Sequence, residues 1–294
     1  MILLTGATGY VGGHLVPALE QRSEGLRCLT RRPGSLEGKV AARTEVARGD
    51  VADRESLAAA LDGVRAAFYL VHSLDSEGGF SDRELHAAET FAPAAREAGV
   101  ERIVYLGGLA SDGDDLSDHL ASRQAVGRVL RESGVPTIEF RASIVIGEGS
   151  ASYELLKTVV EHLPVALLPG WTSSLTQPIA IADVVSYLLA ALDVEAPEST
   201  VVEIGGPERL RYVDLMSRFA EQQGLTRLYL ASPVQDPPGA QTALGLLQSV
   251  VPERARVWLR LVDSMRNDSV VTDDSAAGFG IEPLGVDAAL DAAA

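Results

Sequence analysis

Short β-type runs alternate with amphipathic, helix-length segments over the first half of the chain, and this alternation constrains the fold more than any other feature. The β-type runs are ILLT (2–5), LRCLT (26–30), TEVARGD (44–50), AAFYLV (66–71), RIVYLG (102–107) and TIEFRASIVI (137–146). The helical segments are 11–22, 54–61, 81–98 and 118–133, the last with Ser117 as its N-cap and Gly134 at its end. Each helix fits a crossover between parallel strands, so the sequence predicts an α/β fold with a doubly wound parallel sheet.

The pattern changes after residue 150. SASYELLKTVVEHLP (150–164) predicts a helix, PIAIADVVSYLLAAL (178–192) a strand and then a helix, and TVVEIGG (200–206) a late strand of the same sheet. We therefore expect a main domain over residues 1–150, completed by elements from about 176–205. Residues 151–175 and 206–294, including a helical run at 240–265, would form a smaller lobe over the strand ends, where open α/β sheets bind their ligands.

Composition narrows the classes of partner. The 294 residues carry a formal net charge of −16, and the electrostatic field of this charge repels nucleic acid and anionic membranes. Cys28 is the only cysteine, which excludes an intrachain disulfide and a multi-cysteine metal site, and no metal site is expected. The start MILLTGATG lacks the features of a secretory signal, and prolines interrupt the uncharged stretch 163–182. We expect a cytoplasmic protein with a small-molecule partner and no membrane segment, its oligomeric state open, a homodimer included.

The segment TGATGYVGG follows the first β-type run and opens the first helical segment. It places Gly6, Gly9 and Gly12 in a GxxGxxG pattern, a variant of the dinucleotide fingerprint in which glycines allow a tight turn and a close approach of the backbone to a pyrophosphate. The alternative is a tight strand-to-helix turn without a ligand. The context favours a Rossmann-type dinucleotide site.

Two arginines follow the second β-type run, where an acidic residue would bind the ribose of NAD(H). Arg31 and Arg32 favour a phosphate instead, so NADP(H) is expected over NAD(H), although a solvated arginine pair on a turn would look the same. Asp50, in GDVAD, is placed to accept a hydrogen bond from the adenine amino group or to cap the helix that follows.

With these elements the chain resembles atypical or extended short-chain dehydrogenases/reductases, close to the NmrA-like NAD(P)H-binding proteins and the nucleotide-binding accessory subunit of respiratory complex I. The resemblance covers almost the whole chain and rests on TGATGYVGG, GDVAD, FYLVHS, GVERIVYLGG, HLASRQAVGRVL, FRASIVIGEG, QPIAIADV and VEIGGPE. The cofactor site expected on this basis comprises Gly6, Thr8, Gly9, Tyr10, Val11, Gly12, Arg31, Arg32, Asp50, Val51, Leu70, Val71, His72 and Arg123.

The catalytic positions depart from the pattern of that superfamily. There, a YxxSK motif on a helix supplies a tyrosine, which acts as the acid, and a lysine. A separate serine lies near the end of the preceding strand. Matching Ser122-Arg123 to the SK pair puts His119 at the tyrosine position. Gly107 and Gly108 fall near the serine position, with Ser111 somewhat beyond. The resemblance therefore does not carry over ordinary carbonyl reduction.

His119 and Arg123 lie four residues apart and would share one helix face. A guanidinium stays charged at neutral pH and would bind and orient the cofactor, whereas histidine titrates near neutral pH and is a candidate acid. The alternative is a polar face that displays both to solvent. His72 would shape the pocket or relay a proton, or it is only a hydrogen-bonded structural residue. His14, His86 and His162 are interpreted as structural or surface residues.

Without a tyrosine acid, hydride transfer is easier to acceptors that spread charge, such as quinones or enones. The leading hypothesis is an NADPH-dependent oxidoreductase for a small apolar or aromatic substrate, with a tailoring step in aromatic polyketide biosynthesis as an analogy. The alternatives are a non-catalytic NADP(H) sensor of the NmrA type and a structural subunit that retains its nucleotide. Leu167, Trp171, Trp258 and Phe279 would line an apolar cavity or pack in the core, and none is assigned to the site.

Overall fold

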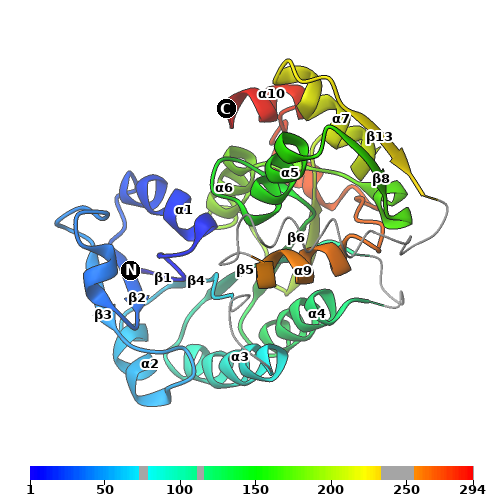
Figure 1. Cartoon of the computed structure of the whole chain (residues 1–294). Coiled ribbons are helices and arrows are strands. Elements are labelled where there is room, and N and C mark those ends of the chain that lie inside the picture. Colours follow the sequence, from blue (N-terminus) through cyan, green and yellow to red (C-terminus); the bar gives the residue numbers. More distant parts are fainter. Residues whose placement is uncertain (73–78, 111–115, 233–254, 294) are drawn as a thin grey trace.

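One central sheet of seven parallel strands organises the chain, in the order β11-β6-β5-β4-β1-β2-β3 (Figure 1). The structure is a computed structural model that describes residues 1–72, 79–110, 116–232 and 255–293. The strands are β1 (Ile2–Thr5), β2 (Leu26–Thr30), β3 (Glu45–Arg48), β4 (Ala66–Tyr69), β5 (Arg102–Gly108), β6 (Thr137–Ala142) and β11 (Thr200–Ile204). The order reverses at β1, between β4 and β2, and this switch point is where such sheets bind ligands. The predicted doubly wound, Rossmann-type sheet is confirmed.

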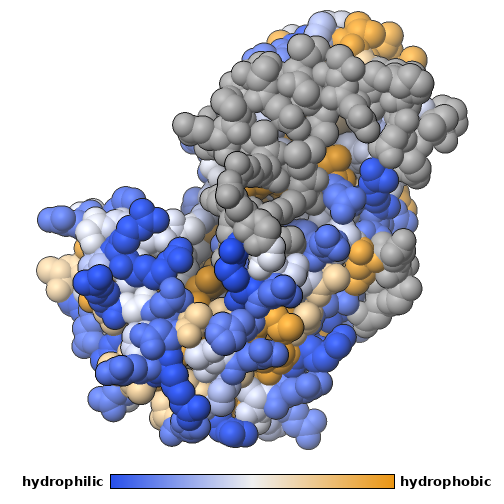
Figure 2. Space-filling view, turned by 60° about the horizontal axis from the view of Figure 1, so that its bottom comes forward, coloured by the Kyte–Doolittle hydropathy of each residue, from blue (hydrophilic) through white to orange (hydrophobic). Residues whose placement is uncertain are grey.

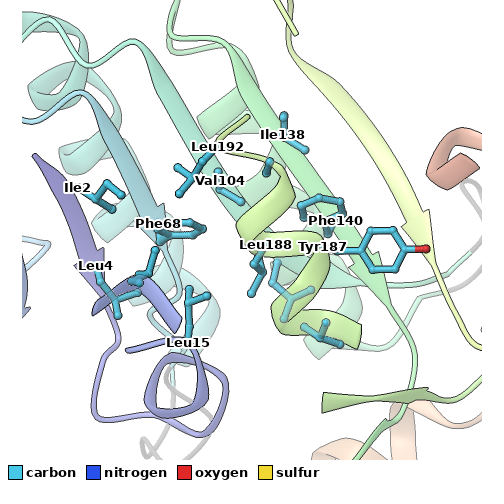
Figure 3. Close-up of a cluster of buried hydrophobic side chains, with 14 of the residues drawn as sticks. Ile2, Leu4, Leu15, Phe68, Val104, Ile138, Phe140, Tyr187, Leu188 and Leu192 are labelled. Atoms are coloured by element: carbon cyan, nitrogen blue, oxygen red, sulfur yellow. The ribbon is translucent and has the colours of Figure 1, made fainter. Parts of the chain in front are cut away.

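Helices cover both faces of the sheet. Those on one face are α1 (Tyr10–Glu20) and α6 (Ile181–Ala190), and those on the other are α2 (Arg54–Leu61), α3 (Phe80–Glu97) and α4 (Asp118–Arg131). Figure 3 shows Leu15 of α1 and Leu188 of α6 directed toward Phe68 of β4 in the first of these layers. Because both faces are covered, the central strands β1 and β4 are buried along their whole length and are mostly apolar instead of alternating.

The predicted helices form close to their expected bounds. The hydroxyl of Ser117 accepts a hydrogen bond from the Leu120 amide (3.3 Å), so it caps α4 as predicted. Cys28 is fully buried in β2. The strand at Thr200–Ile204 pairs with β6 at the edge of the sheet, which confirms that the sheet takes a further strand after an insertion.

The run TIEFRASIVI was predicted as one strand, and this was wrong. The chain leaves the sheet after Ala142, and β7 (Val145–Ile146) pairs instead with β10 (Ile179–Ala180). The break lies at Ser143, whose hydroxyl is 2.7 Å from both the Thr176 and the Ser269 hydroxyls. These contacts redirect the chain toward the later elements, and such long-range partners leave no mark in the local sequence pattern.

Elements after residue 150 build a second hydrophobic cluster, which we call the small lobe. They are α5 (Ala151–His162), α7 (Tyr212–Gln222), α10 (Val286–Ala292), the strand pair β8 (Val165–Leu168) and β13 (Leu228–Ala231), the pair β9 (Leu175–Thr176) and β12 (Leu210–Arg211), and the short η2 turn (Gly170–Ser173). Helix α9 (Ala255–Ser264) packs against both α4 and α5 (Figure 1). The helical run at 240–265 is described only for α9; its remainder lies outside the described residues. The division into domains stays a prediction.

Two short turns complete the fold, η1 (Pro33–Leu36) after β2 and η3 (Ser275–Phe279), which packs beside β11. On the face shown in Figure 2 hydrophilic residues predominate, with small groups of hydrophobic atoms between them. Within the described ranges, no helix combines the length and the apolar character that crossing a membrane requires.

Candidate functional site

The glycine turn between β1 and α1 brings three backbone segments into contact. A Cβ added to Gly6 would come closest to the Leu70 carbonyl oxygen and lie 2.7 Å from its carbonyl carbon, and the φ of Gly6 is +76°. A Cβ on Gly12 would lie 2.8 Å from the Gly6 carbonyl carbon. The Thr5 hydroxyl donates to the Phe68 carbonyl (2.9 Å) and accepts from the Leu70 amide (3.1 Å). Glycine is therefore required where the end of β1, the end of β4 and the start of α1 meet.

A cleft of about 1170 Å³ opens at the carboxyl ends of the central strands, next to this turn. Most residues predicted for the site line it: Gly6, Thr8, Gly9, Tyr10, Val11, Gly12, Arg31, Asp50, Val51, Leu70, Val71, His72 and Arg123. Arg32 and His119 are not among the lining residues. The carbonyl of Arg32 instead accepts hydrogen bonds from the Ser35 amide (2.9 Å) and hydroxyl (2.6 Å), which turns the chain into η1.

One end of the cleft has the features that a dinucleotide phosphate needs. The N-cap of α1 is Gly9, and no side chain of the described ranges caps this helix; the first turn of a helix offers amide groups without intrahelical acceptors. Arg31 lies exposed in the cleft wall just past the end of β2. Free amides, a glycine cradle and a guanidinium fit a phosphorylated dinucleotide.

Asp50 lies in the cleft wall after β3, and its carboxylate accepts a hydrogen bond from the Ala52 amide (3.0 Å). The alternative role as cap of the next helix belongs to another residue, because Asp53 caps α2 by accepting from the Glu55 amide (3.2 Å). The carboxylate of Asp50 is thus available to the cleft.

At the other end of the cleft, Arg123 is held in place by an aromatic ring. Its guanidinium carbon lies 4.7 Å from the centroid of the Tyr105 ring, and the Tyr105 hydroxyl donates to the Arg123 carbonyl (3.0 Å). Arg123 is only 8% exposed, so the alternative of a solvent-facing arginine is wrong. Burial raises the pKa of Tyr105 to about 12, and the tyrosine stays a neutral platform for the cation.

Two histidines from different elements meet beside Arg123. Nε2 of His72 lies 3.1 Å from Nε2 of His119, and Nδ1 of His72 lies 2.7 Å from a carboxylate oxygen of Glu84 on α3. Nδ1 of His119 lies 2.9 Å from the hydroxyl of Ser264 at the end of α9. His119 and Arg123 therefore do not reach the cleft together: Arg123 lines it directly, and His119 lies behind His72.

Helix α9 supplies an apolar part of the cleft wall through Val257 and Trp258. Trp258 is 2% exposed, and its indole N–H has no hydrogen-bond partner among the described residues. Of the other apolar candidates, Trp171 packs in the small lobe against Tyr212, and Phe279 packs against the sheet core. The side chain of Leu167 lies outside the described part of the chain.

Sequence reasoning missed Glu84, Ser264 and the place of His86. Glu84 is 5% exposed and accepts a second hydrogen bond from the Ser122 hydroxyl (3.0 Å). His86, interpreted as structural or surface, lines the cleft. A glutamate and a histidine on an amphipathic helix resemble solvated residues, and the contact from Ser264 to His119 spans 145 positions, so only the fold reveals these roles.

The remaining catalytic positions from the resemblance are only partly described. Gly107 and Gly108 end β5, and a Cβ on Gly108 would lie 2.8 Å from Cδ2 of Leu120. Ser111 lies outside the described residues. His14 and His162 each place Nδ1 2.9 Å from the backbone carbonyl four residues earlier, consistent with their interpretation as structural residues.

Comparison with curated proteins gives partial matches. Sterol demethylase protein B of Methylococcus capsulatus is 31% identical over 185 residues, which cover 61% of this chain and 51% of that protein. The chain thus spans about half the length of this relative, and 30% of the mycobacterial 3 beta-hydroxysteroid dehydrogenase/Delta 5-->4-isomerase that it also matches.

Solved structures match over nearly the full length. The triphenylmethane reductase of Citrobacter sp. in complex with NADP(H) has a TM-score of 0.79 at 18% identity, with 100% of both chains covered. The NADPH-dependent quinone oxidoreductase QOR2 of Escherichia coli, in complex with NADPH, has a TM-score of 0.75 at 18% identity, with 99% of both chains covered. These likenesses show a shared fold. The model of the NmrA-like family matches residues 1–233, and the chain therefore belongs to the NmrA-like family.

Proposed function

We propose that this protein is an NADPH-dependent reductase that acts on a small apolar or aromatic acceptor of the quinone or enone type. One observation carries the proposal: the glycine turn and Arg31, which suit a phosphate, line the same cleft as Arg123 and His72. Two structural neighbours, a quinone oxidoreductase and a triphenylmethane reductase, were solved with NADPH or NADP(H), which supports the same cofactor here.

The cofactor preference depends on Arg31. We assign it to the 2′-phosphate of NADP(H), because a guanidinium matches a phosphate and because Arg31, rather than an acidic residue, lines the cleft just past β2. The amides at the start of α1 would bind the pyrophosphate, and Asp50 the adenine amino group. Arg32 keeps a supporting role only if its exposed side chain turns toward that phosphate.

The chemistry at the other end follows from the side chains there. The bound cofactor supplies a hydride. Arg123 keeps a fixed positive charge that orients the ribose and nicotinamide, and it cannot donate a proton at neutral pH. His72 lies in the cleft wall and is the group that supplies a proton, with His119 behind it. An acceptor that spreads its charge needs only a weak acid, which favours quinones and enones over simple ketones.

Substrate binding is assigned to the small lobe together with α9. Trp258 and Val257 are apolar lining residues of the kind that aromatic ligands prefer. A tailoring step in aromatic polyketide biosynthesis would suit such a pocket, and it rests on the resemblance alone.

The proposal is tested by NADPH oxidation over a panel of quinones, enones and ketones. We expect quinones or enones to be reduced, and NADPH to be preferred over NADH. Arg123→Met should lower kcat/KM by about 10-fold or more, the value of a lost charged hydrogen bond. The matched control is Arg128→Met on the exposed face of the same helix, which should leave kcat/KM unchanged. Turnover of simple ketones alone, or none with any acceptor, would contradict the proposal.

A further inference from the structure

A continuous chain of hydrogen-bonding groups begins at the wall of the cleft with Glu84 and His72 and joins four segments. It passes from Glu84 on α3 to His72 after β4, to His119 on α4 and to Ser264 on α9, with separations of 2.7, 3.1 and 2.9 Å. The Ser264 hydroxyl lies 3.0 Å from that of Ser117, the cap of α4. Every ring nitrogen of both histidines has a partner in this chain.

The acceptor at one end fixes where the protons lie. An ionised carboxylate only accepts, so the contact with Glu84 requires a proton on Nδ1 of His72. The two Nε2 atoms then need one proton between them, because two N–H groups cannot face each other at 3.1 Å and two bare nitrogens make no hydrogen bond. When the Ser264 hydroxyl donates to Nδ1 of His119, the pair is neutral and this proton lies on His119; when Nδ1 of His119 is protonated and Ser264 accepts, the pair carries one positive charge and the proton can lie on either ring.

The surroundings of Glu84 favour the charged carboxylate. Its side chain is 4% exposed, it accepts a hydrogen bond from the Ser122 hydroxyl, and its other oxygen lies 2.7 Å from Nδ1 of His72. An isolated buried carboxylate would be costly, so a charged Glu84 favours a positive charge on the adjacent imidazole. The side chain of His72 is 26% exposed and faces the cleft, so this charge lies at the ligand.

We propose that Glu84 is a positioning residue that holds the proton on Nδ1 of His72, so that His72 and His119 share a single exchangeable proton at their Nε2 atoms beside the cleft. The sharing itself is a property of the protein without ligands. Its use in catalysis rests on the reductase function proposed above.

Other charged groups around the pair belong to three elements. Among the described residues they are Asp82, Arg83 and His86 on α3, Asp118 and Arg123 on α4, and Asp263 and Arg266 at the end of α9 and just beyond it. Asp263 and Arg266 form an ion pair with each other (3.4 Å), and the Arg123 guanidinium lies over the Tyr105 ring. Beside these groups, Glu84 lies in direct contact with His72.

The proton balance of quinone reduction fits a single shared proton. A quinone takes up the hydride of NADPH and one proton, and the products are a hydroquinone and NADP⁺. Nε2 of His72 would exchange its contact with His119 for the quinone oxygen when it gives up the shared proton, and a proton from solvent would then restore the pair. Glu84 remains a carboxylate throughout and takes no part in bond making.

Ring-nitrogen NMR of the protein without cofactor or substrate tests the inference directly. The protein has five histidines, and His72→Gln and His119→Gln identify the two signals. We expect His72 to carry its proton on Nδ1, and the pair to take up one proton in a single step near neutral pH. In Glu84→Gln the midpoint of that step should fall by about one pH unit or more, a tenfold loss of proton affinity.

The matched control is Glu89→Gln, which removes the same charge from an exposed position of the same helix and should move the midpoint by less than about 0.2 pH unit. Equal shifts in the two variants would overturn the inference. If Glu84→Gln does not fold, wild-type protein decides alone: a His72 ring protonated only at Nε2, or two histidines that titrate independently, refutes the sharing.

The same variants separate this inference from the proposed function. With a quinone that is turned over, Glu84→Gln should shift the pH profile of kcat to lower pH by the amount seen in NMR and leave the Kd for NADPH unchanged. If the histidines behave as stated but no acceptor is reduced, the proposed function fails and the shared proton stands.

Discussion

The closest backbone approach in the site is at Gly12, and the substitution Gly12→Ala probes it. Gly12 lies in the first turn of α1, and an added Cβ would come closest to the Gly6 carbonyl oxygen, 2.8 Å from the Gly6 carbonyl carbon and 3.0 Å from Cα of Ala7. All three atoms belong to the backbone. The neighbouring Gly13 is exposed in the same turn, and a Cβ there would meet only the Ala7 carbonyl oxygen at 3.8 Å.

These distances give opposite expectations for the two alanine variants. Alanine is favoured over glycine in a helix by about 1 kcal/mol, and Gly13→Ala should gain up to that amount in unfolding free energy. Gly12→Ala has the same gain but also an overpacking cost of about 1–3 kcal/mol, so it should be about 0–2 kcal/mol less stable than wild type. To restore ordinary contacts the first turn of α1 must move by about 1 Å. When the groups that position a ligand are displaced by about 1 Å, the rate of the reaction that they support falls by up to about 100-fold.

Urea denaturation and calorimetric titration with NADPH measure both effects. We expect Gly12→Ala to bind NADPH at least about 10-fold more weakly, because the amides that face the phosphate have moved. Gly13→Ala should bind as wild type does. Equal stability and equal NADPH affinity of the two variants would refute the predicted backbone clash at Gly12.

Three further outcomes follow from single side chains. Arg31→Ala should weaken NADPH binding by about 10–100-fold and leave NADH binding unchanged, because it removes a charged phosphate contact; parallel titrations with the two cofactors check this. Tyr10→Phe should leave the unfolding free energy unchanged or raise it by up to about 1 kcal/mol in urea denaturation, since the Tyr10 hydroxyl is buried and has no hydrogen-bond partner in the described part of the chain. Burial raises the pKa of the Cys28 thiol to about 12, so native protein at pH 8 should not react with a thiol reagent until it unfolds, and rapid labelling would contradict this.

The sequence predicted the fold because the information is local. Each crossover helix has its own apolar periodicity, Ser117 caps its helix within three residues, and the glycine turn connects adjacent elements. The place of Gly6 and Arg31 in the cleft wall was predictable for the same reason: both directly follow strand ends, where such sheets place their ligands.

What the sequence could not predict depends on contacts between distant elements. Glu139 is 1% exposed in β6 and pairs with both Arg131 and Arg141, and Gly127 of α4 leaves the space that its carboxylate fills. Nothing in the local pattern of TIEFRA distinguishes this buried ion cluster from an ordinary strand. Glu84 was missed for the same reason, since α3 is amphipathic and a carboxylate on it reads as solvated.

The part of the cleft around His72 and Arg123 decides between a reductase and a non-catalytic sensor. Either function would use the glycine turn and Arg31 to hold the nucleotide. Only a reductase also needs a proton supply. The chain from Glu84 to Ser264 keeps the Glu84 carboxylate buried, and a buried carboxylate is costly unless it is paired. His72→Gln therefore separates the two: in a reductase it lowers kcat for a quinone by about 100-fold, the usual value of a positioned acid, with the Kd for NADPH unchanged. In a sensor neither the wild type nor His72→Gln turns over an acceptor, and the substitution changes only the stability of the protein, through the contacts of His72 with α3 and α4.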